Sequence, residues 1–199
     1  MSLPVKLAIG IILAAVVLAA LTSRVIRARN RSQTPSASSG KEVYLGLRDQ
    51  ILKLSRDKCG LPATAAPTEP CAVLMDWGVN NGTATVVAVA DGTVSIYLSG
   101  GGGSLGGGQG HAAIRAAGQK LLNLAKESLP RMQKTTEYPL PGRGQVYFYV
   151  RTTEGVFTAR TSQEELNSRS HPFRYLGDAA QEIITQYRQV QSNSGQGRQ

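Results

Sequence analysis

Residues 71–99 read CAVLMDWGVNNGTATVVAVADGTVSIYLS, and the pattern of this stretch decides the fold. Alternate residues from Val73 to Val79 are apolar, as in a half-buried β-strand. The dipeptide Asn81-Gly82 follows, and both residues tolerate the positive φ of a tight hairpin turn. Asp91-Gly92 repeats the same turn chemistry. We therefore predict three antiparallel strands, over residues 71–79, 83–90 and 93–99, joined by two hairpins.

Helical periodicity and a second hairpin surround this meander. Apolar residues recur at helical spacing over residues 41–58, 111–129 and about 176–190, which predicts three amphipathic helices. The first helix is expected to bury Val43, Leu47, Ile51 and Leu54. Residues 145–152 and 155–160 alternate about Thr153-Glu154-Gly155 and predict the second hairpin. The order α-βββ-α-ββ-α predicts an α+β fold of two layers, a five-stranded antiparallel sheet packed by about three helices.

Two resemblances accompany this pattern. The element order is similar to roadblock and profilin-like modules, which also pack helices on a five-stranded antiparallel sheet. The short sequences at residues 76–83, 90–93 and 155–159, together with the glycine tract 100–110, resemble a group of uncharacterised bacterial membrane-anchored proteins. This second resemblance implies a bacterial source and brings no known activity.

The N-terminal residues 7–21 read LAIGIILAAVVLAAL and contain no polar side chain. A helix over 7–23 would run roughly 26 Å, slightly less than a hydrocarbon core of about 30 Å, and Lys6 and Arg24 could snorkel to close the difference. A cleaved signal peptide is the alternative. Its positive charge would precede the apolar run, where only Lys6 and the amino terminus lie. We therefore predict a short segment 1–6 and an uncleaved transmembrane anchor over 7–23.

The positive charge of the chain is concentrated next to this segment. The formal net charge is +9, yet no acidic residue precedes Glu42, and residues 41–199 hold 17 basic and 13 acidic residues. The remaining cations are Lys6, Arg24, Arg27, Arg29 and Arg31. These arginines predict contact with anionic lipid headgroups, and nucleic acid is the less favoured partner.

Four arginines on the C-terminal side of the apolar run predict that the rest of the chain lies in the cytoplasm. A periplasmic or extracellular placement is the alternative. Residues 24–40 are expected to form a basic juxtamembrane segment and flexible linker, 41–191 the soluble α+β domain, and 192–199 a disordered tail.

Cys59 and Cys71 flank a stretch rich in proline and alanine. In an oxidising compartment a disulfide between them would close a short loop, and in the cytosol both would stay reduced. Two unrelated buried thiols are the alternative interpretation. A zinc site would need more cysteine or histidine nearby, so no metal is predicted.

The glycine tract satisfies G-x-G-x-x-G at Gly101–Gly106 but lacks the parallel βαβ unit of a dinucleotide site, and no lysine follows to make a P-loop. A mobile linker is the simpler interpretation. The functional one is an anion site, formed by the backbone N–H groups of Gly103, Gly106 and Gly110 with the side chains of His111 and Arg115.

No catalytic set and no cofactor motif is visible in the sequence. The two histidines have no local nucleophile signature, and Asp76 is expected to be solvated beside its turn. Trp77 and the cluster Tyr147-Phe148-Tyr149 could form a recognition surface, although alternating aromatic residues usually belong to a core. We therefore predict a membrane-anchored protein-interaction module, with a membrane-tethered enzyme or small-anion binder at the glycine tract as the alternative.

Overall fold

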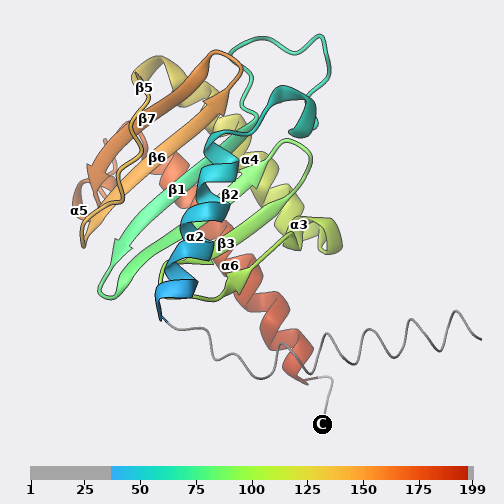
Figure 1. Cartoon of the computed structure of the whole chain (residues 1–199), viewed down its shortest axis with the longest axis vertical. Coiled ribbons are helices and arrows are strands. Elements are labelled where there is room, and N and C mark those ends of the chain that lie inside the picture. Colours follow the sequence, from blue (N-terminus) through green and yellow to red (C-terminus); the bar gives the residue numbers. More distant parts are fainter. Residues whose placement is uncertain (1–36, 197–199) are drawn as a thin grey trace, which may run out of the picture. The chain divides into compact units, whose positions relative to one another are not determined.

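A computed structural model describes residues 37–196, which form an α+β domain on one antiparallel sheet (Figure 1). The strands occur in the sheet in the order β4-β3-β2-β1-β6-β7-β5. Their bounds are β1 Ala72–Val79, β2 Gly82–Val89, β3 Val94–Leu98, β4 Gly103–Ser104, β5 Gln133–Thr135, β6 Gln145–Thr152 and β7 Gly155–Ser162.

Turn chemistry produces the hairpins of this sheet where the sequence predicts them. β1 and β2 pair from Ala72 opposite Val89 to Val79 opposite Gly82, and Gly82 has φ +138°. The β6–β7 hairpin closes at Gly155, with φ +132°. Pairing of β1 with β6 then joins the two hairpin groups at the centre of the sheet.

Two short edge strands correct the predicted strand count from five to seven. β4 pairs with β3 through only two residues, and β5 pairs with β7 through three. Neither segment is long enough to show an alternating pattern in sequence, because two or three residues give no period. β4 lies inside the glycine tract. There a Cβ on Gly103 would lie 2.1 Å from the carbonyl oxygen of Ile96.

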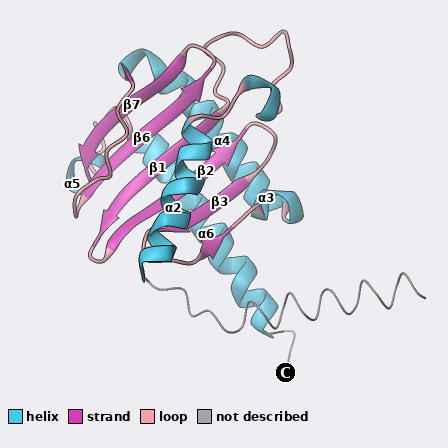
Figure 2. Cartoon of the chain, viewed as in Figure 1, coloured by secondary structure: helices cyan, strands magenta, loops and turns pink. Residues whose placement is uncertain are grey.

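The helices cover both faces of the sheet. Their bounds are α2 Ala37–Leu52, α3 Gly107–Gly110, α4 Ala112–Ser128, α5 Gln163–Leu166 and α6 Arg174–Gln196, with 3₁₀ turns η1 Arg56–Lys58 and η2 Leu129–Arg131. Figure 2 shows α2 in front of the sheet and α4 and α6 behind it. The predicted two-layer arrangement is therefore wrong, and the domain has three layers.

Both sheet faces are apolar, which explains the third layer. On β1, Val73 and Met75 pack with α4 and α6, whereas Ala72 and Leu74 belong to a separate core with α2. Each face must be covered, since exposed apolar area is unfavourable in water. The α4 and α6 side is packed as predicted, with Ile114, Leu121, Leu122, Leu176, Ala180 and Ile183 buried.

Helix α2 and the residues just after it partly bury the predicted Leu47, Ile51 and Leu54 against the core under the helix, and the most deeply buried residues of α2 lie beside them. Tyr44, Arg48 and Leu52 are buried, whereas Val43 is 62% exposed. Helix α2 also begins at Ala37, inside the segment assigned to the linker, and α6 continues to Gln196, past the start of the predicted tail. The choice of stripe follows from a polar contact with the sheet, which an apolar count along the helix cannot reveal.

The predicted fold class and localisation both included a membrane-spanning helix. Among residues 37–196, no helix combines the length and the apolar composition needed to cross a bilayer. The single-pass membrane assignment is corrected accordingly, and the structure supports an α+β fold. Residues 7–23 and the arginines at 24, 27, 29 and 31 lie outside the described residues.

Candidate functional site

The sheet edge at β5 and β7 holds a cavity of about 400 Å³. The 3₁₀ turn η2, which contains Pro130, ends α4 and turns the chain into β5. β5 then pairs with only part of β7, placing Gln133 opposite Thr158 and Thr135 opposite Val156. β7 continues beyond this pairing through Ala159 and Arg160. The cavity is lined by Arg131, Gln133, Lys134, Thr135, Thr158, Ala159, Arg160 and Phe173, and we call it the edge pocket.

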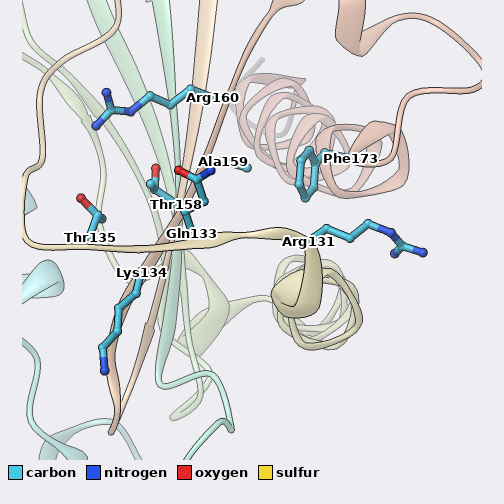
Figure 3. A pocket seen from close by; sticks show the side chains of 8 residues that line it. All are labelled: Arg131, Gln133, Lys134, Thr135, Thr158, Ala159, Arg160 and Phe173. Carbon is cyan, nitrogen blue, oxygen red and sulfur yellow. The ribbon is translucent and has the colours of Figure 1, made fainter.

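Figure 3 shows the arrangement of these side chains. Gln133 and Thr158 lie together in the middle of the group, while Arg160, Lys134 and Arg131 extend outward in three different directions. The polar floor is therefore neutral and the rim is cationic. The volume falls within the roughly 300–1,000 Å³ typical of small-ligand sites.

The hydroxyl of Thr158 is the unusual feature of the floor. Thr158 is 8% exposed, and among the described residues its Oγ1 is the only buried side-chain oxygen or nitrogen without a hydrogen-bond partner. Its cross-strand neighbour Tyr149 donates its own hydroxyl to the carbonyl of Pro139. A buried hydroxyl without a partner is unfavourable by about 1–3 kcal/mol. It therefore needs a particular explanation.

No acidic side chain balances the rim. Arg131, Lys134 and Arg160 make no ion pair with another side chain in the described part of the chain, and no aspartate or glutamate lines the cavity. The Arg160 guanidinium lies 5.2 Å from the centre of the Tyr147 ring, which supports its stem without neutralising its charge. The edge pocket therefore has a local excess of positive charge.

A second polar cluster lies under α2 and is closed to ligands. Arg48 donates from Nε to Asp76 Oδ2 at 2.8 Å, and Thr85 donates to Asp76 Oδ1 at 2.6 Å. Asp76 has no exposed area, so the prediction of a solvated carboxylate is wrong. Burial raises the pKa of Asp76, although Arg48 and Thr85 oppose that shift. With every partner internal, this cluster fixes α2 to the sheet.

The glycine tract is ordered by its own hydrogen bonds. Gly103 pairs in β4, and the Gly106 N–H donates to Ser95 Oγ at 3.0 Å. Arg115 donates from Nε to the Gly108 carbonyl at 2.8 Å and from Nη2 to the Gln109 carbonyl at 3.0 Å. Gly110 and His111 are exposed at the start of α4. The Nε and Nη2 donors of Arg115 are therefore already used by carbonyl oxygens within the tract.

The two cysteines do come together. Their Sγ atoms lie 2.7 Å apart in the core under α2, and the structure shows both as free thiols. Among the described residues, no group of three histidine, cysteine, aspartate or glutamate side chains is arranged to hold a metal ion.

Thr161, Glu165 and His171 form a small cluster whose chemistry is structural. His171 Nδ1 accepts the Phe173 N–H at 3.3 Å, so in the neutral ring Nε2 carries the proton and faces Thr161 Oγ1 at 3.2 Å. Thr161 Oγ1 in turn donates to Glu165 at 3.1 Å. This direction of donation leaves no basic nitrogen facing the hydroxyl, so the histidine cannot activate it.

Trp77 lies between two further cavities, of about 490 and 240 Å³, that share it with Gln163. Its indole N–H donates to Gln163 Oε1 at 3.1 Å. Phe148 and Tyr149 are buried in opposite cores, so they cannot join Trp77 in one recognition surface.

No motif in the sequence marks the edge pocket. Its residues come from η2, β5, β7 and the turn before α6, and they meet only through the β5–β7 register. The only signal in the sequence is a pair of cations, Arg131 and Lys134, within four residues. Comparison with protein-family models, curated proteins and solved structures finds no match to the chain.

Proposed function

We propose that this domain is a non-enzymatic binding module that takes an anionic group, phosphate or carboxylate, in the edge pocket. The observation that carries the proposal is the Thr158 hydroxyl, buried without a hydrogen-bond partner beside a cationic rim. A phosphate or carboxylate oxygen would accept a hydrogen bond from this hydroxyl, and because the Thr158 oxygen is itself buried, the surrounding side chains must move to admit the ligand. Hydrogen bonds to a charged acceptor are shorter and stronger than neutral ones.

The composition of the pocket favours an anion over other ligands. Arg131, Lys134 and Arg160 can contribute charge, and the Gln133 amide can donate a further hydrogen bond. A cation would meet a positively charged rim and no carboxylate. An apolar ligand would leave the Thr158 hydroxyl without a hydrogen-bond partner, and this unfavourable term would offset the free energy gained by filling the pocket.

The anion function is thereby assigned to a different place from the glycine tract. There, Arg115 holds carbonyl oxygens, and the N–H groups of Gly106 and Gly107 donate to Ser95 and Tyr187. An anion at the tract would have to break these contacts first. At the edge pocket, an anion would not have to displace a carboxylate, because no rim cation is ion-paired with one among the described residues.

The test is a titration of the full chain with inorganic phosphate and with a short phosphoserine peptide, followed by calorimetry. Thr158→Val keeps the side-chain shape and removes the hydroxyl, and we expect it to weaken binding about fivefold to thirtyfold, from the hydrogen-bond energy of about 1–2 kcal/mol. Arg160→Ala should weaken it by a similar factor. Lys120→Ala removes an exposed cation of α4 that does not line the pocket and serves as the matched control.

Binding of the peptide but not of free phosphate would identify a partner segment as the source of the anion. Equal binding of both would identify a small free anion. If neither binds, or if Thr158→Val and Lys120→Ala behave alike, the proposed function is wrong.

A further inference from the structure

Cys59 and Cys71 meet at the boundary between α2 and the sheet. Cys59 ends the 3₁₀ turn η1, and Cys71 is the residue before β1. Their exposed fractions are 0% and 1%, and the Sγ atoms are 2.7 Å apart. A disulfide bond measures about 2.05 Å, so the two sulfur atoms are already close to bonding distance.

The backbone on either side of each cysteine is held by hydrogen bonds. Cys71 donates its N–H to Arg151 at 2.7 Å and accepts from Ala90 at 3.0 Å, which places it in register with the central strands. Cys59 donates its N–H to the Arg56 carbonyl at 3.3 Å, within η1. The sulfur contact is therefore imposed by the fold and not by a flexible loop.

The segment between the cysteines is also tied down. One Arg56 nitrogen, Nη2, lies within hydrogen-bonding distance of three carbonyl oxygens, those of Pro62, Ala63 and Ala65, the last two at 2.7 Å. Thr153 donates to Pro67 at 2.9 Å from the β6–β7 turn. A covalent link at the base of residues 60–70 fits this arrangement, because the loop it would close is already folded.

We propose that Cys59 and Cys71 are a disulfide-forming pair, oxidised by exchange with a disulfide such as oxidised glutathione. One cysteine thiolate attacks the external disulfide, forming a mixed disulfide and releasing one external thiolate. The second cysteine thiolate then attacks the protein sulfur of the mixed disulfide and releases the other. Two protein thiols are oxidised, the reagent is reduced to two thiols, and the released thiolates take up the two protons.

The exchange belongs to folding and not to the finished domain. Burial, with the neighbouring Cys59, raises the pKa of the Cys71 thiol to about 12, so the folded chain holds very little of the Cys71 thiolate at pH 7. The thiolate is the reacting form. A chain that folds without an oxidant therefore keeps unreactive buried thiols, and a chain that folds with one keeps a bond protected from reductants.

The test refolds the full chain, unfolded and reduced, in a buffer of reduced and oxidised glutathione. The product is then unfolded, treated with iodoacetamide without reductant, and weighed intact. We expect no alkylation and a mass lower by two hydrogen atoms than the reduced chain. Cys59→Ser should instead accept one alkyl group or one glutathione.

The melting temperature distinguishes a disulfide that fits the native fold from one that strains it. The oxidised chain should melt about 10 °C above the chain refolded with a phosphine reductant. Cys59→Ala/Cys71→Ala should melt at the same temperature under both conditions. Two alkyl groups on the refolded wild-type chain, or a disulfide that lowers its melting temperature, would overturn the proposal. Neither readout depends on the edge pocket.

Discussion

The ion pair under α2 allows a quantitative prediction. Arg48 contacts Asp76 Oδ2 through both Nε, at 2.8 Å, and Nη2, at 2.7 Å, and the exposed fractions of the two side chains are 6% and 0%. Thr85 holds the second carboxylate oxygen. Replacing Arg48 by methionine keeps much of the side-chain volume and leaves the Asp76 charge buried without its counter-ion.

The expected loss of stability depends on the Asp76 carboxylate, which stays buried after Arg48 is replaced. Removing one partner of a buried ion pair costs about 3–5 kcal/mol, because the other charge stays desolvated. Arg48 also donates to the carbonyl of Tyr138 at 3.0 Å, and its guanidinium lies 5.1 Å from the Tyr149 ring centre. Both contacts are lost as well, so we expect Arg48→Met to fall in the upper part of that range.

Urea unfolding of the purified chain, followed by circular dichroism, measures the loss. With a slope of about 2 kcal/mol/M, Arg48→Met should lower the midpoint by roughly 2 M. The double variant Arg48→Met/Asp76→Leu removes both charges and should recover a large part of the stability. A loss below about 1 kcal/mol for Arg48→Met would refute the buried pair, and so would strict additivity of the two substitutions.

Two further predictions concern the packing of two helix glycines and the N-terminal cap of α5. Gly118→Ala in α4 would bring a Cβ within 2.5 Å of Val94 Cγ2 and should destabilise the chain by about 1–3 kcal/mol. Gly46→Ala in α2 places its Cβ where no atom lies within 4 Å and should stabilise the chain by up to about 1 kcal/mol. If urea unfolding ranks the stabilities of the two variants the other way, the packing described for these helices is wrong. Hydrogen bonds from the Ser162 backbone and hydroxyl lower the pKa of the exposed Glu165 carboxyl below 4.5, so the cap of α5 is stabilised above that pH and loses this contribution as the pH falls through the lowered pKa. An NMR titration should place that pKa below 4.5 and find it raised in Ser162→Ala; a wild-type value at or above 4.5 would contradict the cap.

Local signals account for the elements that the sequence predicted well. The predicted strand 145–152 coincides with β6, and the predicted helix 111–129 differs from α4 by one residue at each end. Alternation, helical spacing and glycine turns are properties of neighbouring residues, so they can be interpreted without knowing the fold.

The sequence-based predictions fail where a contact between residues far apart in the sequence determines which side chains are buried. In the sequence, Tyr44 and Arg48 resemble solvent-facing residues of α2. They are buried because they form hydrogen bonds with Thr85 and Asp76 of the sheet. Val43 has the more apolar side chain and is exposed. The third layer covers the second apolar face of the sheet, and the sequence signal for it is the run of consecutive apolar residues 72–75, which does not alternate.

The same reasoning applies to the edge pocket. Thr158 belongs to an ordinary alternating strand, and the sequence does not show that its hydroxyl lacks a hydrogen-bond partner where β5 begins opposite it, at Gln133. The glycine tract attracted attention in sequence because glycine is rare in such density. Its function in the structure is to let β4 and α3 approach their neighbours, as at Gly103.

The most direct test of anion binding is an NMR titration of the full chain with the phosphoserine peptide. The proposal predicts saturable shifts centred on the backbone amides of Gln133, Thr158 and Arg160, with those of Gly106 and Arg115 unmoved. It further predicts that Thr158→Val weakens the response while Lys120→Ala leaves it intact. Shifts centred on the glycine tract, or no saturable shift at the β5–β7 edge, would contradict it.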